Sequence, residues 1–204
     1  MLILVLVTLL LTHVAAQPAA PLQYANKTYK TAKIGTQTWF AENLNYEAEG
    51  SVCYENNPAN CAKYGHLYNQ ETAMKVCPEG WHLPNNDEWK KLYRFIDDYK
   101  DYENPYRSRS TVGKHLKAVS GWNEDEDGEN GNGIDDYGFS ALPGGYGLSD
   151  GSFVNVGIYG GWWSASESGN NDGRNYLHLL LSSSNLIWND YEKSSLFSVR
   201  CIKD

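Results

Sequence analysis

The stretch that decides the fold is CPEGWHLPNNDEWKKL, residues 77–92. Its second half carries the start of a helix, because Asn85 or Asn86 can accept hydrogen bonds from the first free backbone amides of a helix. Asp87 and Glu88 follow, and their negative charge favours the positive end of a helix. Apolar residues then recur at helical spacing, namely Trp89, Leu92, Tyr93 and Ile96. The sequence therefore predicts an amphipathic helix that begins at this Asn pair.

Weaker elements lie on either side of this helix. Upstream, residues 29–39 alternate polar and apolar around Gly35-Thr36, which predicts a hairpin, and residues 67–76 predict a first helix. Downstream, residues 113–120 predict a short helical piece, and a long region rich in Gly, Asn, Asp, Ser and aromatic residues follows. Late strands are expected at 176–181, 185–188 and 197–202. Two early helices and short antiparallel strands predict a loop-rich α+β domain.

The first residues predict a secretory signal peptide. Residues 2–11 are an almost unbroken apolar run, shorter than the roughly 20 residues that cross a bilayer, and Val14-Ala15-Ala16 suits signal peptidase. We therefore expect residues 1–16 to be removed. The usual positive charge before the run is missing, which leaves a buried strand or a retained anchor as the alternative. Residues 17–28 then predict a disordered tail, and residues 29–204 a single domain.

The charge balance excludes one large class of partner. The formal net charge is −8 and the pI is near 5.1, whereas nucleic-acid binding needs a clustered positive face. No second long apolar run follows the first, so no membrane span is expected in the mature chain. These features predict a secreted, extracellular protein.

Four cysteines occur, at Cys53, Cys61, Cys77 and Cys201. An even count behind a signal peptide predicts two disulfides formed in an oxidising compartment. A zinc site is the alternative, but the chain has no C-x-x-C pair and no His at the usual ligand spacing. Three pairings are possible from sequence alone. Cys53 and Cys61 enclose the short polar loop YENNPAN, which favours a local bridge and leaves Cys77 to pair with Cys201.

Five sequence blocks, in this order, resemble one protein family. They are YKTAKIGTQTWFAENLNY (29–46), CPEGWHLPNNDEWKKL (77–92), DDYGFSALPGGYGLSDGSF (135–153), GGWWSASE (160–167) and FSVRCIKD (197–204). From about residue 29 to the end, the chain resembles the Fibrobacter succinogenes major paralogous domain. The resemblance implies a secreted or surface-exposed bacterial protein with a C-type lectin-like fold, similar to that of formylglycine-generating enzymes. In C-type lectin-like domains a long disulfide ties an early helix to the last strand, a role that Cys77 and Cys201 would fill.

An acidic loop predicts a calcium site. The run NEDEDG, residues 123–128, matches the first half of a calcium loop, in which oxygen ligands alternate and a glycine allows a sharp turn. Ile134 replaces the glutamate that would close a standard loop, but two aspartates beside it could close a non-standard one. The expected ligands are Asn123, Asp125, Asp127, Asp135 and Asp136. The alternative is a solvated acidic turn.

Aromatic residues are abundant, with 7 Trp and 15 Tyr. Their flat faces can bind sugar rings, but they also fill loop-rich cores. Tyr146, Tyr159 and Trp188 lie near glycines or turns, and these three are the predicted ligand-binding platforms on the surface. Core positions are predicted for Trp39, Trp81, Trp89 and one of Trp162 and Trp163.

The sequence contains no G-x-S-x-G, H-E-x-x-H or P-loop motif. A carboxylate pair such as Glu42 with Glu71 is available in principle, as in any acidic chain. The expected function is therefore a secreted or cell-surface binding module for polysaccharide or another glycan, without catalysis. The alternatives are a secreted sugar-active enzyme with a loop-built site and an adhesive surface protein that binds another protein.

Overall fold

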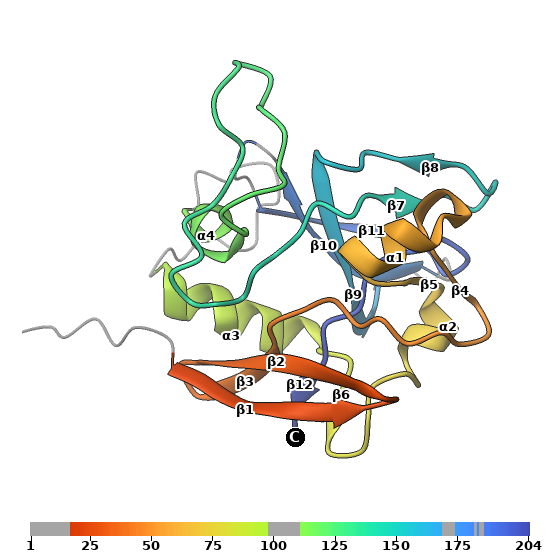
Figure 1. Cartoon of the computed structure of the whole chain (residues 1–204), viewed down its shortest axis with the longest axis horizontal. Helices are drawn as coiled ribbons and strands as arrows, with labels where there is room; N and C mark the ends of the chain where they lie inside the picture. Colours follow the sequence, from red (N-terminus) through yellow and green to blue (C-terminus); the bar gives the residue numbers. More distant parts are fainter. Residues whose placement is uncertain (1–16, 98–110, 169–173, 182, 184–185) are drawn as a thin grey trace, which may run out of the picture.

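The computed structural model describes residues 17–97, 111–168, 174–181, 183 and 186–204 (Figure 1). The predicted signal peptide, residues 1–16, lies outside these residues. Within them the chain is a loop-rich α+β domain with four α-helices and short antiparallel strands, as predicted. No helix in this part of the chain is both long and apolar enough to cross a membrane.

The strands form several small sheets. In chain order they are β1 (Gln17–Tyr24), β2 (Lys27–Ile34), β3 (Gln37–Phe40), β4 (Ser51–Val52), β5 (Leu67–Tyr68), β6 (Trp81–His82), β7 (Tyr146–Gly147), β8 (Phe153–Val154), β9 (Tyr159–Glu167), β10 (Arg174–Leu181), β11 (Leu186–Glu192) and β12 (Ile202–Lys203). The helices are α1 (Pro58–Tyr64), α2 (Gln70–Ala73), α3 (Asn86–Ile96) and α4 (Val112–Leu116), and a 3₁₀ turn, η1, covers Tyr54–Asn56.

The largest sheet has five antiparallel strands in the order β1-β2-β3-β12-β6. The hairpin predicted at residues 29–39 is confirmed as β2 and β3. Its turn contains Gly35 with a φ of 59°, a conformation that glycine adopts without steric cost. The last strand, β12, enters between β3 and β6, so the C-terminal end of the chain closes the sheet.

The prediction of a disordered tail at residues 17–28 was wrong. This segment contains β1, which pairs with β2 in an antiparallel hairpin. Pro18 and Pro21 donate no backbone hydrogen bond, but β1 is an edge strand, where proline is tolerated. Leu22 and Tyr24 pack against the core, and the burial of their side chains stabilises the pairing.

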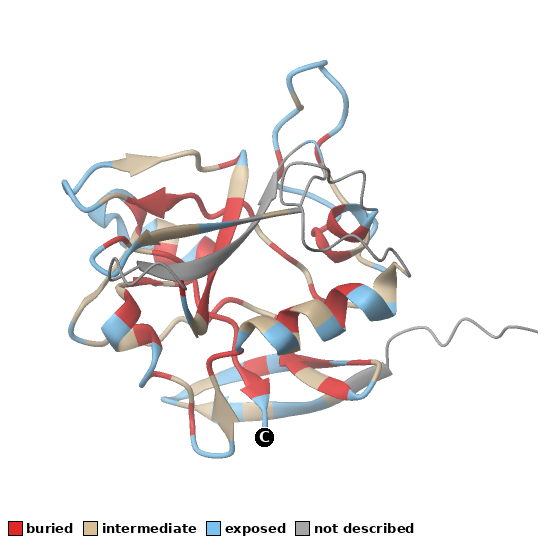
Figure 2. Ribbon diagram, turned by 180° about the vertical axis from the view of Figure 1, so that it is seen from behind, coloured by how far each residue is buried: buried red, intermediate tan, exposed pale blue. Residues whose placement is uncertain are grey.

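The helix predicted after the Asn pair is confirmed as α3. Asn85 accepts hydrogen bonds from the backbone amides of Asp87 and Glu88, and Glu88 Oε2 accepts one from the amide of Asn85 at 2.8 Å. This capping box holds the helix start in place. In Figure 2, α3 lies over the five-stranded sheet, and the centroids of Trp89 and Trp39 are 4.8 Å apart across that contact. Of the predicted core tryptophans, Trp39 and Trp89 are buried with at most 1% of their surface exposed, whereas Trp81 is only partly buried. Both Trp162 and Trp163 are buried, where one of the two was predicted.

Two other element predictions were only partly right. Residues 67–76 form β5 and the single turn of α2 instead of one helix, because the side chain of Asn69 caps α2 by accepting from the amide of Thr72 at 2.9 Å. Residues 197–202 were predicted as a strand, but only the last of them belongs to β12. Before it the chain makes isolated bridges, at Phe197 with β5 and at Ser198 with β9.

Both predicted disulfides are confirmed. Cys53 and Cys61 are joined across 8 residues, and Cys77 and Cys201 are joined across 124 residues. The long bridge links the segment before β6 to the segment before β12, so it ties together two parts of one sheet. Cys201 is fully buried.

A buried polar cluster centres on Arg200, which is fully buried. The guanidinium donates hydrogen bonds to three backbone carbonyls, those of Phe40, Phe139 and Ser140. Its Nε also donates to Asn43 Oδ1 at 2.8 Å, and the same oxygen accepts from Trp162 Nε1 at 2.9 Å. Burial lowers the pKa of Arg200 to about 9, so the guanidinium stays charged at neutral pH.

His82 joins the start of α3 to the end of the chain. Its Nε2 lies 2.8 Å from Glu88 Oε1, and its Nδ1 lies 2.6 Å from Asp204 Oδ1. Burial lowers the pKa of His82, but the hydrogen bonds to Asp204 and Glu88 outweigh this effect, so the net pKa is raised. The stabilisation is therefore fully present below the unfolded pKa, near 6.5, and is lost as the pH rises through the folded pKa.

We expect the melting temperature of the wild-type protein to exceed that of the His82→Gln variant by more at pH 6 than at pH 8. These ion pairs are partly exposed, so the difference should stay within about 2–4 °C. Thermal unfolding of both proteins at the two pH values, followed by circular dichroism, measures the effect. A larger advantage of the wild type at pH 8 would contradict the assignment of the raised pKa.

Candidate functional site

A groove is lined by residues from the tip of the β1–β2 hairpin, from residues 46–50, and from α2 and the residues that follow it. Its volume is about 540 Å³, within the range of small-ligand sites. Its lining combines two aromatic rings with charged, polar and small side chains: Tyr24, Tyr46, Ala48, Glu49, Gly50, Asn69, Glu71, Thr72, Lys75 and Val76. We call it the tyrosine groove.

Tyr24 and Tyr46 supply its aromatic surface. Both side chains are partly exposed, and their ring centroids lie 5.3 Å apart with the planes tilted by 52°. A row of rings continues into the core, because Tyr24 lies 6.5 Å from Tyr29, which stacks on Phe40 at 5.0 Å. The buried rings support the exposed ones from behind, so both tyrosines are positioned before any ligand arrives.

Two buried phenol groups hold the backbone that carries Tyr46. The hydroxyl of Tyr68 donates to the carbonyl of Tyr46 at 2.7 Å and accepts from its amide at 3.0 Å. The hydroxyl of Tyr29 accepts from the amide of Asn45 at 3.2 Å. Burial strongly raises the pKa of Tyr68, which keeps its hydroxyl protonated and able to donate. The loop that presents Tyr46 is therefore attached to the core by side chains of β2 and β5.

The other wall of the groove depends on a glycine. Gly50 has a φ of 81°, and a Cβ at this position would lie 2.5 Å from both Asn69 Nδ2 and Thr72 Oγ1. Thr72 Oγ1 also donates to the carbonyl of Glu49 at 2.7 Å. The loop can approach α2 this closely only because residue 50 has no side chain.

Charged groups of both signs lie along the rim of the groove. Lys75 Nζ lies 2.8 Å from Glu71 Oε1, and the two side chains are 69% and 82% exposed. An ion pair this exposed contributes little to stability, so both groups can exchange their partner for a ligand hydroxyl at small cost. The hydrogen bond from Lys75 lowers the pKa of Glu71, which keeps the carboxylate ionised as an acceptor.

Glu42 and Glu71 do not line the same groove. Glu71 lines the tyrosine groove, whereas Glu42 is not part of that lining and accepts a hydrogen bond from the amide of Lys30 at 3.1 Å. A glycosidase needs one carboxyl group whose pKa is raised so that it can donate a proton. The pKa of Glu71 is shifted in the opposite direction. The ionised Glu71 can therefore accept hydrogen bonds from hydroxyl groups of a ligand in the groove.

Tyr146 is not the exposed platform that the sequence predicted. Only 7% of its surface is exposed, and its ring stacks on Phe197 at 4.9 Å. The neighbouring glycines, which suggested a surface turn, instead allow close backbone packing. Gly145 has a φ of 64°, and a Cβ there would lie 2.6 Å from Val154 O.

The two other predicted platforms lie in the three-stranded sheet. Tyr159 begins β9 and is partly exposed, with its ring 6.3 Å from that of Tyr146. Trp188 lies in β11 opposite residue 178 of β10, but its side chain lies outside the described part of the structure. A ligand-binding role for either residue stays a prediction.

Two of the predicted calcium ligands in the acidic loop, Asn123 and Asp125, make other contacts. Asp125 Oδ1 accepts hydrogen bonds from the amides of Asp127 and Glu129 at 3.0 and 2.9 Å, which closes a tight turn. Asn123 donates its amide to Gly157 O at 2.8 Å, and its side chain fills the space beside that glycine. Asn123 therefore contacts the loop at Gly157, whereas Asp125 contacts the turn at residues 127–129.

The two aspartates expected to close the calcium site are engaged elsewhere. Asp135 accepts from the amide and hydroxyl of Ser140 at 2.7 and 2.5 Å, and Asp136 pairs with His115 Nδ1 at 2.9 Å. No three acidic side chains among the described residues lie close enough to share one ion. Calcium takes six to eight oxygen ligands, so this arrangement does not fit it. Calcium binding stays a prediction that requires Asp135 and Asp136 to leave these partners.

Sequence reasoning missed the tyrosine groove for a specific reason. Tyr24 belongs to the segment predicted as disordered, and Tyr46 ends a block that carried no predicted role. The available signal was the alternation of apolar Leu22 and Tyr24 just before a polar turn, which is typical of a strand with one buried face.

Residues 32–203 match the protein family described as the Fibrobacter succinogenes major domain. No curated protein and no solved structure matches the chain.

Proposed function

The chain belongs to the Fibrobacter succinogenes major domain family, and on this premise we propose that it is an extracellular, non-catalytic module that binds carbohydrate in the tyrosine groove. The observation that carries the proposal is the pair of partly exposed, pre-positioned rings of Tyr24 and Tyr46. The two disulfides support an extracellular location, because such bonds persist in oxidising compartments.

Carbohydrate fits this combination of groups. The C–H faces of a sugar ring stack on aromatic rings, and its hydroxyls need donors and acceptors close to that stacking surface. Tyr46 and Tyr24 offer the stacking surface, while Glu71 and Lys75 offer an ionised acceptor and a donor at the rim. Because the rings are held by the core, binding loses little side-chain entropy.

The same groups favour binding without turnover. Hydrolysis of a glycosidic bond needs a proton donor with a raised pKa, and Glu71 has a lowered one. No residue of the acidic loop 123–136 lines the tyrosine groove, so we expect carbohydrate binding there to be unaffected by a chelator.

We expect the Tyr46→Ala variant to lose at least about tenfold in affinity for an insoluble polysaccharide, which corresponds to about 1.4 kcal/mol. Removal of this ring takes away half of the stacking surface, whereas Tyr46→Phe keeps the ring and should retain most of the affinity. Pull-down of purified protein on a panel of plant and bacterial polysaccharides, quantified by depletion of the supernatant, measures the loss.

Tyr137→Ala serves as the matched control. Tyr137 is a partly exposed tyrosine that lines a separate hollow of about 560 Å³ beside residues 135–140. An equal loss of affinity in Tyr46→Ala and Tyr137→Ala, or a loss only in Tyr137→Ala, would place the site elsewhere. Melting temperatures of all variants establish that the fold is intact.

One further readout separates the competing functions. Release of reducing ends during the same incubations would show turnover and replace the binding module with a sugar-active enzyme. If the panel shows no retention of the protein and no release of reducing ends, the result would favour an adhesive protein that binds a protein partner.

A further inference from the structure

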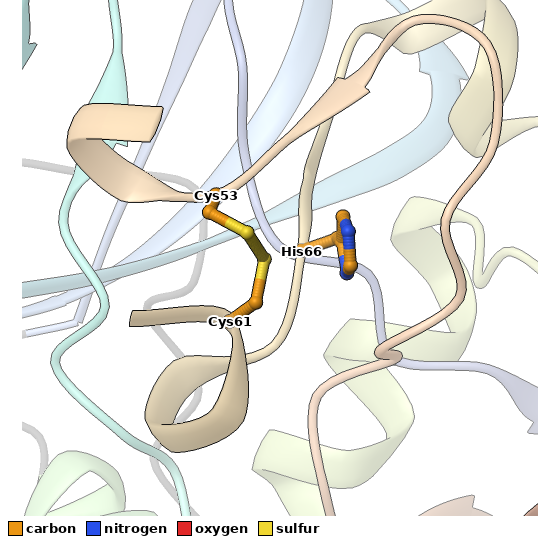
Figure 3. A group of neighbouring side chains, drawn as sticks. All are labelled: Cys53, Cys61 and His66. Atoms are coloured by element: carbon orange, nitrogen blue, oxygen red, sulfur yellow. A yellow bond between two sulfur atoms is a disulfide. The ribbon is translucent and has the colours of Figure 1, made fainter. Parts of the chain in front are cut away.

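The disulfide between Cys53 and Cys61 has a histidine beside it. The two sulfur atoms and a ring nitrogen of His66 all lie within 4.8 Å of one another (Figure 3). Cys61 is buried, whereas Cys53 and His66 are partly exposed, so the cluster can be reached from solvent. Two cysteine sulfurs and one imidazole are a ligand set that zinc uses with one position left open.

The fold, and not the spacing along the chain, brings His66 to the cysteines. Helix α1 carries Cys61 and ends at Gly65, whose φ of 79° turns the chain back. A Cβ at Gly65 would lie 2.7 Å from Leu44 O, so only glycine allows this close passage. The amide of His66 then donates to the same carbonyl at 3.1 Å, which holds the histidine in place.

The hydrogen bond made by the imidazole decides which of its nitrogens is free to bind a metal. Its Nδ1 lies 2.7 Å from Asn45 Oδ1, and an amide oxygen can only accept, so Nδ1 carries the hydrogen and Nε2 carries an available lone pair. Zinc-bound histidines almost always donate their other N–H to an oxygen in this way.

We propose that Cys53, Cys61 and His66 form a redox-gated zinc site, which is closed while the disulfide is intact and opens when a small thiol reduces it. The thiolate of the reductant attacks Sγ of the partly exposed Cys53, which breaks the S–S bond and leaves Cys61 as a thiolate. A second thiolate then displaces Cys53 and forms the disulfide of the reductant. In total, two electrons pass from the two thiols to the protein. Each cysteine sulfur is released as a thiolate and takes up a proton, and zinc displaces that proton when it binds.

The proposal requires that the Cys77–Cys201 bridge stays intact while the Cys53–Cys61 bridge is reduced. The other disulfide has one fully buried cysteine, Cys201, and one partly exposed cysteine, Cys77, and it links different elements from the loop between residues 53 and 61. Separation of Cys53 from Cys61 therefore loosens a short surface loop while the five-stranded sheet keeps its clasp.

Zinc titration of the reduced protein tests the site. The full chain is treated anaerobically with a water-soluble phosphine until an alkylating probe labels Cys53 and Cys61, but not Cys77 and Cys201, in a parallel sample. Zn²⁺ is then titrated against a chromophoric chelator. We expect one ion per chain after reduction and none before. Co²⁺ in place of zinc should show the thiolate charge-transfer and visible bands of a tetrahedral site.

Three variants make the result specific. His66→Ala should weaken zinc binding about 100-fold, or about 2.7 kcal/mol, because it removes a ligand. Asn45→Ala should weaken it about tenfold, because it removes only the hydrogen-bond partner of the imidazole. His115→Ala is the matched control and should bind as the wild type does, since that histidine pairs with Asp136. Unchanged affinity in His66→Ala overturns the proposal, as does equal uptake by the double variant Cys53→Ser/Cys61→Ser.

Folding supplies a second readout. If reduction removes the near-ultraviolet circular dichroism of the native protein, zinc should restore it, because an ion bound by three side chains stabilises the folded state. Failure of zinc to restore the signal also overturns the proposal.

Discussion

Removal of the Cys77–Cys201 disulfide in a Cys77→Ala/Cys201→Ala variant should lower the free energy of unfolding by about 5 kcal/mol. The bridge closes a loop of 124 residues, and the entropy that it removes from the unfolded chain grows with the logarithm of loop length. A domain is stabilised by only about 5–15 kcal/mol in total, so this loss would bring the protein close to unfolding. Urea denaturation followed by tryptophan fluorescence measures the change.

The Cys53→Ala/Cys61→Ala variant is the internal control for this experiment. Its loop has a separation of only 8 residues, and the same relation gives about 2.5 kcal/mol. The long bridge should therefore matter about twice as much as the short one. Equal losses in the two variants would show that chain entropy does not govern the stabilisation by either bond.

Replacement of Arg200 by Met should cost about 3 kcal/mol or more. The variant removes four hydrogen bonds, three of them to backbone carbonyls, and each buried acceptor left unsatisfied carries a desolvation penalty of about 1–3 kcal/mol. The opposing effect is release from the cost of burying a charge, which the lowered pKa of Arg200 reflects. Apolar replacement of a buried charge is neutral or stabilising when its partners are replaced too, but backbone carbonyls cannot be replaced.

A double-mutant cycle with Asn43 tests the cluster as a unit. Asn43 Oδ1 accepts from both Arg200 and Trp162, so Asn43→Ala should also be destabilising. Residues of one hydrogen-bond network couple, and the double variant should therefore lose less than the two single losses added together. Strict additivity, or a more stable Arg200→Met variant, would show that the desolvation of the charge dominates instead.

The features that could be predicted from sequence were those with a local cause. The start of α3 follows from Asn85 and Glu88, which lie three residues apart and satisfy each other's backbone amides. The Cys53–Cys61 bridge follows from a loop too short to need help from the rest of the fold. The Gly35 turn of the β2–β3 hairpin is local in the same sense, because one glycine conformation sets it.

The features that sequence reasoning missed depend on contacts between distant residues. The spacing in NEDEDG predicts a calcium loop, but it does not show that Asp136, one of the residues expected to close it, pairs with His115, 21 positions away. Tyr146 has glycine neighbours like a surface residue, yet Phe197, 51 positions later, covers its ring. Whether a ring is exposed is decided by what packs on it, and the flanking residues do not contain that information.

The sequence by itself therefore determined the family, the α+β class, the main helix and the pairing of the cysteines. Only the tertiary structure decided that β1 pairs at the edge of the sheet, that Tyr24 meets Tyr46, and that His66 lies beside the Cys53–Cys61 bridge. Capping boxes, turns and short disulfide loops are closed by neighbours within a few residues. Grooves and ligand clusters are instead built where separate segments meet, and their positions follow from the packing of the whole core.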